Sequence, residues 1–270
     1  MLEVLIVERI IFLADMHGSA PDLSAEDFDA IIAGGDFCQT SWLRDLIFSS
    51  PDDEWWKHAD REWLKKKSKQ SIESGKKVVK HMLSYGAPVF TIPGNTDFYG
   101  KHHLRFMSDK YEKITKGAFD MNMSLLEFEG INLIGYGGTA GPEIVDGSDD
   151  EVEHFQELYS YFHALFSEAD MRSTIVATHV PPAGYGFDVI RNPRSPMNGM
   201  AWGSQLMRRL KLDFRPKLMA FGHFHENPGK RRCGRTMLLN PGPAFEGNYA
   251  VISTGKRWSV RIKKSGLAVI

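Results

Sequence analysis

The 270-residue sequence has little cysteine, no long apolar run and no excess of either charge. Its two cysteines, Cys38 and Cys233, are too few and too far apart for a disulfide framework, which favours a reducing compartment. No stretch approaches the roughly 20 apolar residues that a membrane span needs. With 33 Lys and Arg against 34 Asp and Glu, the net charge of −1 gives no electrostatic basis for coating nucleic acid or a membrane surface.

Signals that would divide or target the chain are also lacking. It contains no internal repeat, low-complexity segment or flexible linker, so residues 1–270 are expected to form one domain. The N-terminus lacks the positive segment of a signal peptide, and Glu8-Arg9 interrupts its first apolar run. We therefore expect a cytoplasmic protein. The sequence does not indicate an oligomeric state.

Short apolar runs alternate with longer amphipathic segments, which is typical of an α/β protein. The runs are too short for stable helices and end at glycine or a polar residue, so each is predicted to be a buried strand. Helices are predicted from an N-cap at Ser50 to residue 84, with Ser68 as the candidate break, and over residues 151–170 and 202–210. The predicted buried strands are residues 5–13, 30–33, 88–92, 174–177 and 218–221.

Other strands are expected to be antiparallel. Glu129-Gly130 separates residues 124–128 from 131–136, which predicts a hairpin. Residues 236–239, 249–253 and 258–262 are predicted as closing strands near the C-terminus. The long connection over residues 180–203 is a candidate substrate-facing segment, because loops of that length are often functional.

Each of the five buried strands is followed by residues that bind metals. The carboxyl ends of strands in an α/β sheet open onto one crevice, so these side chains are predicted to converge there. Alternate residues of an extended segment point the same way, which places Asp15 beside His17 and His223 beside His225. The seven side chains are Asp15, His17, Asp36, Asn95, His179, His223 and His225.

Seven oxygen and imidazole donors without a thiolate suit divalent transition metals. They are too many for one ion, and two ions that share a carboxylate are the economical arrangement. Two-metal sites clamp the attacking and leaving oxygens of a phosphoryl displacement. The pattern therefore predicts a dinuclear centre that acts on phosphate esters.

Taken in order, the motifs resemble the calcineurin-like metallophosphoesterase family, most closely its small prokaryotic phosphoesterases. The family pattern is Asp-x-His, Gly-Asp, Gly-Asn-His-Asp/Glu, a lone His and Gly-His-x-His. This chain follows it from Asp15 to Asn240-Pro241-Gly242. The resemblance implies an α/β fold in four layers, with two β-sheets packed as a sandwich and flanked by helices.

The resemblance also implies how two divalent ions would be held, with Mn expected and Fe, Zn, Ni or Co as alternatives. Asp36 would bridge the ions, and a hydroxide shared by them would attack phosphorus in line. The first ion would be held by Asp15, His17, Asp36 and His225, and the second by Asp36, Asn95, His179 and His223.

One position departs from the family pattern: Thr96 stands where most members carry a histidine that orients the phosphate and protonates the leaving oxygen. A threonine hydroxyl donates a hydrogen bond but titrates too high to act as a general acid near neutrality. His102 and His103 follow closely and are candidates to replace the missing acid. Asp36, Asn95, Thr96 and His103 form the predicted catalytic set.

Four further residues are assigned supporting roles. Arg191 and Arg194, in the long loop after His179, are candidates to hold a substrate phosphate. Asp97 and Glu226 adjoin predicted ligands and are candidates to orient the imidazoles from outside the ligand set.

These features predict a metal-dependent phosphoesterase acting on a small phosphodiester or phosphomonoester. A nuclease on single-stranded nucleic acid remains an alternative, although the net charge of −1 does not favour it. A protein-binding scaffold of the same fold is the alternative outside enzymes, and such scaffolds typically lose metal ligands. No membrane partner is expected.

Overall fold

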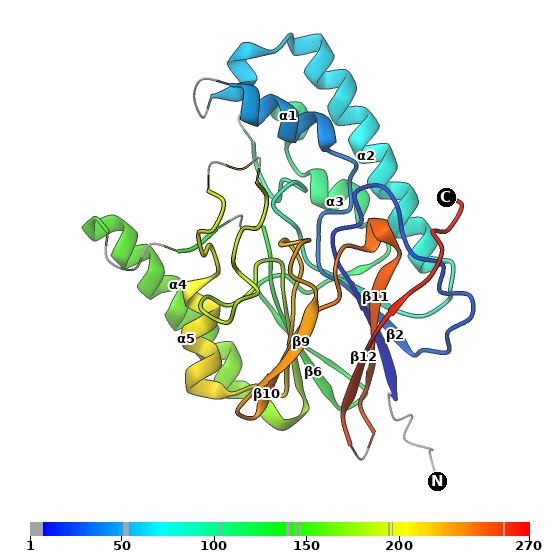
Figure 1. The fold of residues 1–270 in the computed structure, drawn as a ribbon, viewed down its shortest axis with the longest axis vertical. Helices are drawn as coiled ribbons and strands as arrows, with labels where there is room; N and C mark the ends of the chain where they lie inside the picture. The colour runs from blue at the N-terminus through cyan, green and yellow to red at the C-terminus, as the bar shows by residue number, and fades with distance from the viewer. Residues whose placement is uncertain are drawn as a thin grey trace.

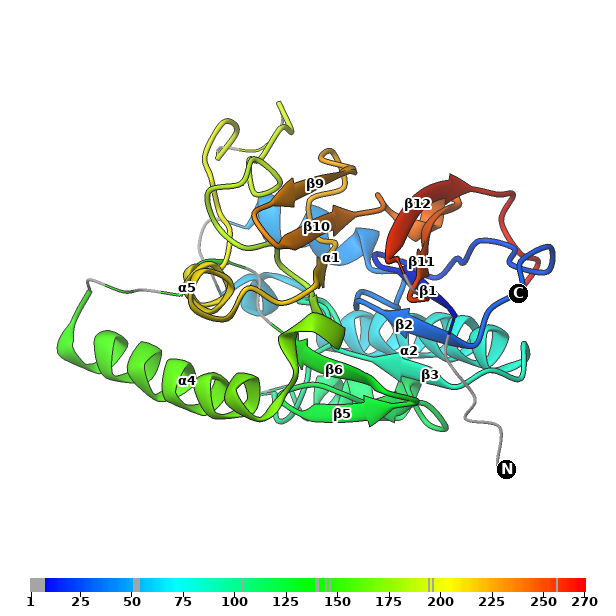
Figure 2. The ribbon, with the colours of Figure 1, turned by 90° about the horizontal axis from the view of Figure 1, so that it is seen from below.

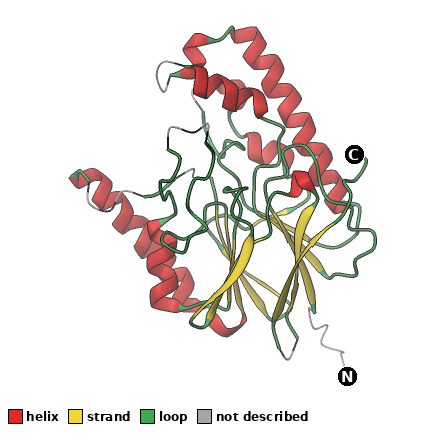
Figure 3. Cartoon of the chain, viewed as in Figure 1, coloured by secondary structure: helices red, strands yellow, loops and turns green. Residues whose placement is uncertain are grey.

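The computed structural model describes residues 8–50, 54–102, 104–138, 141–143, 145, 147–193, 195, 197–255 and 257–270. Two six-stranded sheets pack face to face in this part of the chain, and helices cover both outer faces (Figures 1 and 2). The predicted four-layer α/β sandwich is therefore confirmed. Figure 3 shows the strands at the centre and the helices outside them. None of the described helices combines the length and the apolar character that crossing a membrane requires.

The first sheet joins the N-terminal strands to the C-terminal hairpin. Strands β1 to β4 run parallel, and β11 pairs antiparallel with both β1 and β12. Helix α2 (Arg61–Leu83) and the short α3 (Lys110–Ile114) pack on its outer face. The strand order is β12 (Ser259–Lys264), β11 (Asn248–Ser253), β1 (Arg9–Leu13), β2 (Ala30–Ala33), β3 (Val89–Thr91) and β4 (Phe119–Asp120).

The second sheet carries α4 (Asp149–Glu168) and α5 (Gln205–Phe214) on its outer face. Its central strands are parallel, and each edge is closed by an antiparallel partner, which includes the predicted hairpin of β5 and β6. The strand order is β5 (Leu125–Phe128), β6 (Ile131–Tyr136), β7 (Thr174–Thr178), β8 (Leu218–Ala220), β10 (Thr236–Asn240) and β9 (Gly229–Cys233).

Burial on both faces explains why the central strands are almost continuously apolar. In β1, Ile10 and Phe12 face the layer between the sheets, while Ile11 and Leu13 face α2. All four side chains are fully buried. Strands with two buried faces have apolar residues at every position, which made the five parallel strands recognisable.

The first helical region differs from the prediction. The expected helix beginning at Ser50 is wrong, because α1 (Ser41–Ser49) ends there and α2 begins only after Asp60. The Asp60 carboxylate accepts a hydrogen bond from the Trp63 amide at 2.8 Å and so caps α2. Helix α2 continues through the buried Ser68 without a break. Residues 51–53 of the predicted helix start lie outside the described residues.

Helix α1, the turn η1 (Trp55–His58) and the start of α2 form a small cap with its own apolar cluster. Leu43, Trp55, Leu64 and Met107 are buried in it, the last from the turn η2 (Arg105–Met107). In Figure 1 the cap lies at the top, beyond the carboxyl ends of β1 and β2. The site predicted at those ends therefore has a helical neighbour that the sequence interpretation missed.

The other two helices agree with their predictions to within a few residues. A capping box between Ser148 and Glu151 fixes the start of α4. The Ser204 hydroxyl accepts from the Met207 amide and fixes the start of α5. The short turns η3 (Met171–Ser173) and η4 (Ala244–Glu246) complete the described helical segments.

Gly75 allows α2 to approach the loop after β2, and this contact generates a stability prediction. Glycine to alanine in a helix interior normally stabilises by about 1 kcal/mol. Here a Cβ at residue 75 would lie 2.7 Å from the buried Cys38 Sγ. We expect Gly75→Ala to lower the free energy of unfolding by about 1–3 kcal/mol, because the core has no room for it.

Urea denaturation of four proteins in a double-mutant cycle checks this prediction: wild type, Gly75→Ala, Cys38→Ala and the double variant. Removing Sγ should relieve most of the cost of Gly75→Ala, so the two changes should be strongly non-additive. Additive effects, or stabilisation by Gly75→Ala alone, would show that the contact does not limit packing.

Candidate metal centre

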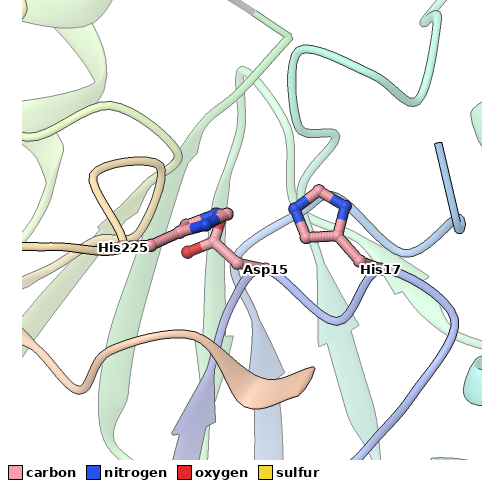
Figure 4. A group of neighbouring side chains, drawn as sticks. All are labelled: Asp15, His17 and His225. Atoms are coloured by element: carbon pink, nitrogen blue, oxygen red, sulfur yellow. The ribbon is translucent and has the colours of Figure 1, made fainter. Parts of the chain in front are cut away.

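The seven predicted donors lie together at one end of the two sheets. They come from the segments that follow β1, β2, β3, β7 and β8, as the topology predicts. Figure 4 shows three of them, with Asp15 between the imidazoles of His225 and His17. Segments more than 200 residues apart meet here: the His223 amide donates to both Asp15 carboxylate oxygens, at 3.1 and 3.0 Å.

A first group of donors is formed by Asp15, His17 and His225. One ligand atom from each lies within 4.8 Å of the other two. His225 Nε2 is 3.4 Å from Asp15 Oδ1. The ring of Phe245 packs edge-on against both imidazoles, with centroid distances of 5.5 Å to His17 and 5.3 Å to His225. These three donors have the spacing of a metal-ligand set.

A second group is formed around the side-chain oxygen of Asn95. This Oδ1 lies 2.9 Å from His179 Nε2 and 3.0 Å from His223 Nδ1. The two imidazole nitrogens are 3.3 Å apart. Asn95, His179 and His223 therefore direct three donor atoms at one small volume, as the second predicted ligand set requires.

The Asp36 carboxylate joins the two groups. Its Oδ2 lies 3.7 Å from His17 Nε2 and 3.7 Å from His179 Nε2. Its Oδ1 is turned the other way, where it accepts from the Thr96 amide at 3.0 Å and from the Thr96 hydroxyl at 2.8 Å. One oxygen of Asp36 thus faces both donor groups, and the other is held by Thr96.

Left-handed backbone turns bring the donors together. Asp15, His17, Asp36 and His223 have φ values of 56°, 44°, 57° and 68°, and they are four of the nine non-glycine residues with positive φ in the described chain. We expected the alternation of side chains along an extended strand to place these donors side by side. That explanation is wrong, because the chain leaves the extended conformation before Asp15. Such conformations cost about 1–3 kcal/mol each and concentrate at functional sites.

Close backbone approach also requires glycine beside Asp36. A Cβ at Gly94 would lie 2.1 Å from Asp36 Oδ1 and 2.3 Å from its amide nitrogen. Because both clashing atoms belong to the fixed loop, no side chain fits at residue 94. The glycine of the third motif is therefore needed to bring Asn95 and Thr96 to Asp36.

The protonation states suit metal binding. Burial opposes ionisation of Asp36, but the neighbouring His179 and His17 outweigh it and lower its pKa. The same balance, with His225 as the main partner, keeps the pKa of Asp15 below its usual range. Burial also lowers the pKa of His17, and burial with the charge of His179 lowers the pKa of His223 to about 3. Both carboxylates are thus anionic and both imidazoles neutral near neutrality, as ligation requires.

His225 differs from these two histidines. Its burial favours the neutral form, but the charge of Asp15 and the contact with it raise the pKa of His225 overall. A cation at the first donor group would compete with that proton, so metal binding there would release it.

The residues present fit a pair of divalent cations. His17 Nε2 is buried and makes no hydrogen bond to the described residues, although it lies 3.7 Å from Asp36 Oδ2. A buried nitrogen without a hydrogen-bond partner is costly unless another group, such as a metal ion, binds it. The donors are carboxylate, amide and imidazole, which suits Mn, Fe, Zn, Ni or Co.

The residues predicted to orient the imidazoles have other partners in the structure. The Asp97 carboxylate accepts from the backbone amides of Asp36, Phe37 and Gly94 at 2.7, 3.1 and 2.8 Å. Burial and the charge of Asp36 raise the pKa of Asp97 to about 6. Glu226 accepts from the Arg191 amide at 2.8 Å.

Imidazole orientation at the second donor group comes instead from a backbone carbonyl. His179 Nδ1 lies 2.9 Å from the carbonyl oxygen of Gly34, which leaves Nε2 directed at Asn95 and Asp36. Backbone carbonyls serve this role at many metal sites. Sequence reasoning could not identify this partner, because every residue has a carbonyl.

The remaining predicted residues lie nearby or outside the described chain. Arg191 is exposed in the long loop, while Arg194 and His103 lie outside the described residues. His102 is engaged within its own loop, where its Nδ1 accepts from the Leu104 amide at 3.0 Å. Its ring also packs edge-on against Phe98, at 4.9 Å between centroids.

Two cationic residues lie near the centre that the sequence did not predict to be there. Lys110 is fully buried at the start of α3, and its Nζ donates to the Thr96 carbonyl at 3.0 Å. Arg44 is exposed on α1, and its charge works against the raised pKa of His225. Neither lies in a motif, so only the folded chain reveals that they adjoin the site.

Comparison with known proteins finds one relative by sequence and several structures with a similar fold. An uncharacterized protein of Methanocaldococcus jannaschii is 23% identical over 181 residues, which cover 66% of this chain and 73% of that protein. A dimetal phosphatase from Danio rerio has a similar structure, with a TM-score of 0.58, 9% identity and 96% of both chains covered. Another crystal structure reaches a TM-score of 0.66 at 16% identity, covering 97% of this chain and 100% of its own. At such identities these structures show a shared fold.

The family model described as metallophosphoesterase, calcineurin superfamily, matches residues 6–263. The match includes every strand of both sheets except the last residue of β12, and all seven donors. The chain therefore belongs to the calcineurin superfamily of metallophosphoesterases.

Proposed function

We propose that this protein is a metal-dependent phosphoesterase that hydrolyses a small phosphodiester or phosphomonoester at a centre of two divalent ions. The observation that carries the proposal is the position of Asp36 Oδ2, which lies 3.7 Å from a nitrogen of each donor group. A single carboxylate oxygen between two nitrogen-rich groups is suited to bridging two cations.

The two donor groups define the residues that would hold each ion. Asp15, His17, Asp36 and His225 would hold the first, and Asp36, Asn95, His179 and His223 the second. When bound, two divalent ions lower the pKa of water and neutralise the charge that develops on a transferring phosphoryl group. We expect Mn²⁺ to support activity, with Fe, Zn, Ni and Co as alternatives.

The chain's own residues would orient this centre and keep its charges fixed. Thr96 holds one oxygen of Asp36 through two hydrogen bonds, so the carboxylate cannot rotate freely. The Thr96 hydroxyl is thereby directed at Asp36, and its role is to position that carboxylate rather than to supply a proton. His103 and His102 are the candidate acids if the leaving-group test below shows that an acid is present.

Two other functions use the same fold. A nuclease would need a basic surface for its substrate, and the chain has 33 cationic against 34 anionic residues. A protein-binding scaffold would not need all seven donors, nor the strained backbone that brings them together. The enzyme acting on a small ester is therefore the function we favour.

The first prediction concerns the shared ligand. Asp36→Asn should weaken the binding of both ions, because Thr96 will hold the amide oxygen and leave the amide NH₂ facing the donor groups. His225→Ala should weaken the binding of mainly one ion. Elemental analysis after dialysis against Mn²⁺ and removal of free metal checks this expectation, with exposed His154→Ala as the matched control. A wild type that never binds more than one ion per chain at saturating Mn²⁺ contradicts the dinuclear centre.

The second prediction concerns the leaving group. Because Thr96 supplies no acid, the wild-type rate should fall steeply as the pKa of the leaving alcohol rises, so aryl phosphodiesters should react faster than alkyl ones. A positioned acid is worth about 10²–10⁴-fold, and Thr96→His should flatten the dependence if the new imidazole is accommodated. A series of diesters assayed at matched metal occupancy measures the slope. A flat wild-type profile with chemistry rate-limiting would mean that another acid is present, and His102→Gln and His103→Gln would locate it.

The third prediction concerns the long loop. We propose that Arg191 and Arg194 bind the substrate phosphate, so replacing either with alanine should lower kcat/KM by about 10–100-fold without loss of metal. The contact of the residue 191 amide with Glu226 does not depend on the side chain and should persist. Arg172→Ala is the matched control, since that exposed arginine pairs with Asp170 on the turn that precedes β7. Unchanged kinetics in the Arg191→Ala/Arg194→Ala double variant would exclude both residues.

A further inference from the structure

Lys110 is a buried lysine whose position is not explained by packing alone. Its side chain has no exposed surface, and its Nζ donates to the Thr96 carbonyl at 3.0 Å. The same ammonium lies over the ring of Phe98, 5.3 Å from the centroid. Removing an ammonium from water is costly, and an apolar side chain of similar size is usually as stable or more stable in such a place. The position therefore points to a role for the charge.

The contacts of Lys110 lead directly to Asp36. The Thr96 carbonyl that it holds belongs to the peptide joining Thr96 to Asp97. The amide and the hydroxyl of the same threonine both donate to Asp36 Oδ1. The Asp97 carboxylate accepts the Asp36 amide at 2.7 Å. Side chain and backbone of Asp36 are thus both held by the Thr96-Asp97 pair, and Lys110 holds that pair from outside.

The charge is also placed close to buried carboxylates. Asp36 and Asp97 are both buried, and the Asp97 carboxylate accepts a hydrogen bond from the Asp36 amide. The Lys110 ammonium donates to the carbonyl of Thr96, the residue that precedes Asp97. A fixed cation at this place offsets the repulsion between the two carboxylates.

We propose that Lys110 is a positioning residue of the metal centre: it fixes the Thr96-Asp97 peptide so that Asp36 keeps Oδ1 on Thr96 and presents Oδ2 to both donor groups. This inference rests on the proposed function only in taking Asp36 as the shared ligand. Lys110 is not one of the seven donors, and it would act through Thr96 and Asp97.

The chain offers a matched control for this role. Lys211, on α5, is also buried and lies over an aromatic ring, with its Nζ 4.6 Å from the centroid of Tyr185. Its ring partner is in the long loop and not in the Thr96-Asp97 pair. Lys110→Met and Lys211→Met therefore remove the same charge from similar surroundings, but only the first change reaches Asp36.

The experiment measures Mn²⁺ binding by titration calorimetry on wild type, Lys110→Met, Lys110→Arg and Lys211→Met, together with kcat and KM on an aryl phosphodiester at saturating Mn²⁺. We expect Lys110→Met to weaken Mn²⁺ binding about 10–100-fold, the usual effect of losing a residue that orients ligands. At saturating metal, kcat should fall while KM stays within about twofold. Lys110→Arg should recover part of the affinity, and Lys211→Met should bind Mn²⁺ as wild type does.

A second pair of variants keeps the test decisive if Lys110→Met is poorly folded. Thr96→Val removes the hydroxyl with little change of shape, and Thr96→Ser retains it. If Lys110 acts through Thr96, the loss of affinity in the double variant of Lys110→Arg and Thr96→Val should fall short of the product of the single losses. Independent, multiplicative losses would overturn the proposal.

The outcomes separate this inference from the proposed function. A wild type that binds neither Mn²⁺ nor any of the alternative ions Fe²⁺, Zn²⁺, Ni²⁺ and Co²⁺ contradicts the proposed function itself. A wild type that binds two ions, with Lys110→Met binding them equally tightly or Lys211→Met equally impaired, overturns only the role of Lys110.

Discussion

The orientation of the Asp36 carboxylate is the constraint on which the rest of the site depends. One oxygen is held by the amide and hydroxyl of Thr96, and the other lies 3.7 Å from a nitrogen of each donor group. If the Asp36 carboxylate rotated about one side-chain torsion, the two donor groups would no longer share an oxygen between them. Much of the surrounding structure prevents that rotation: Gly94 brings the third motif close, Asp97 holds the Asp36 amide, and Lys110 holds the Thr96 carbonyl.

The arrangement is costly in the absence of cations. The buried carboxylates of Asp15 and Asp36, the buried imidazole of His179 and four left-handed non-glycine residues lie within one small region. Each strained residue costs about 1–3 kcal/mol, and the unpartnered His17 Nε2 adds a desolvation cost. Two six-stranded sheets with three large apolar clusters offset this cost, and they hold the loops that carry the donors. The stability of the sandwich thus allows the loops at its edge to keep their strained conformations.

The sequence predicted those parts of the molecule that depend on local pattern. Strands such as β1 and β7 have two buried faces, so their apolar runs stand out and the donors after them could be assigned to one edge. The boundary between α1 and α2 was mispredicted, because Asp60 caps α2 and the sequence alone does not distinguish it from another capping residue such as Ser50. The roles of Thr96, Asp97 and Lys110 could not be predicted either. Thr96 and Asp97 contact Asp36 across 60 and 61 residues of the chain, and Lys110 reaches the Thr96 carbonyl across 14. The spacing of residues in the sequence does not indicate such contacts.

The central claim is that Asp36 Oδ2 is shared by two ions, and a crystal structure of the Mn²⁺-loaded protein with anomalous scattering tests it most directly. We predict two anomalous peaks on either side of Asp36 Oδ2, one contacting His17 and His225 and the other contacting Asn95, His179 and His223. Thr96 should still donate to Asp36 Oδ1. A single peak, or two peaks that Asp36 does not join, would contradict the account.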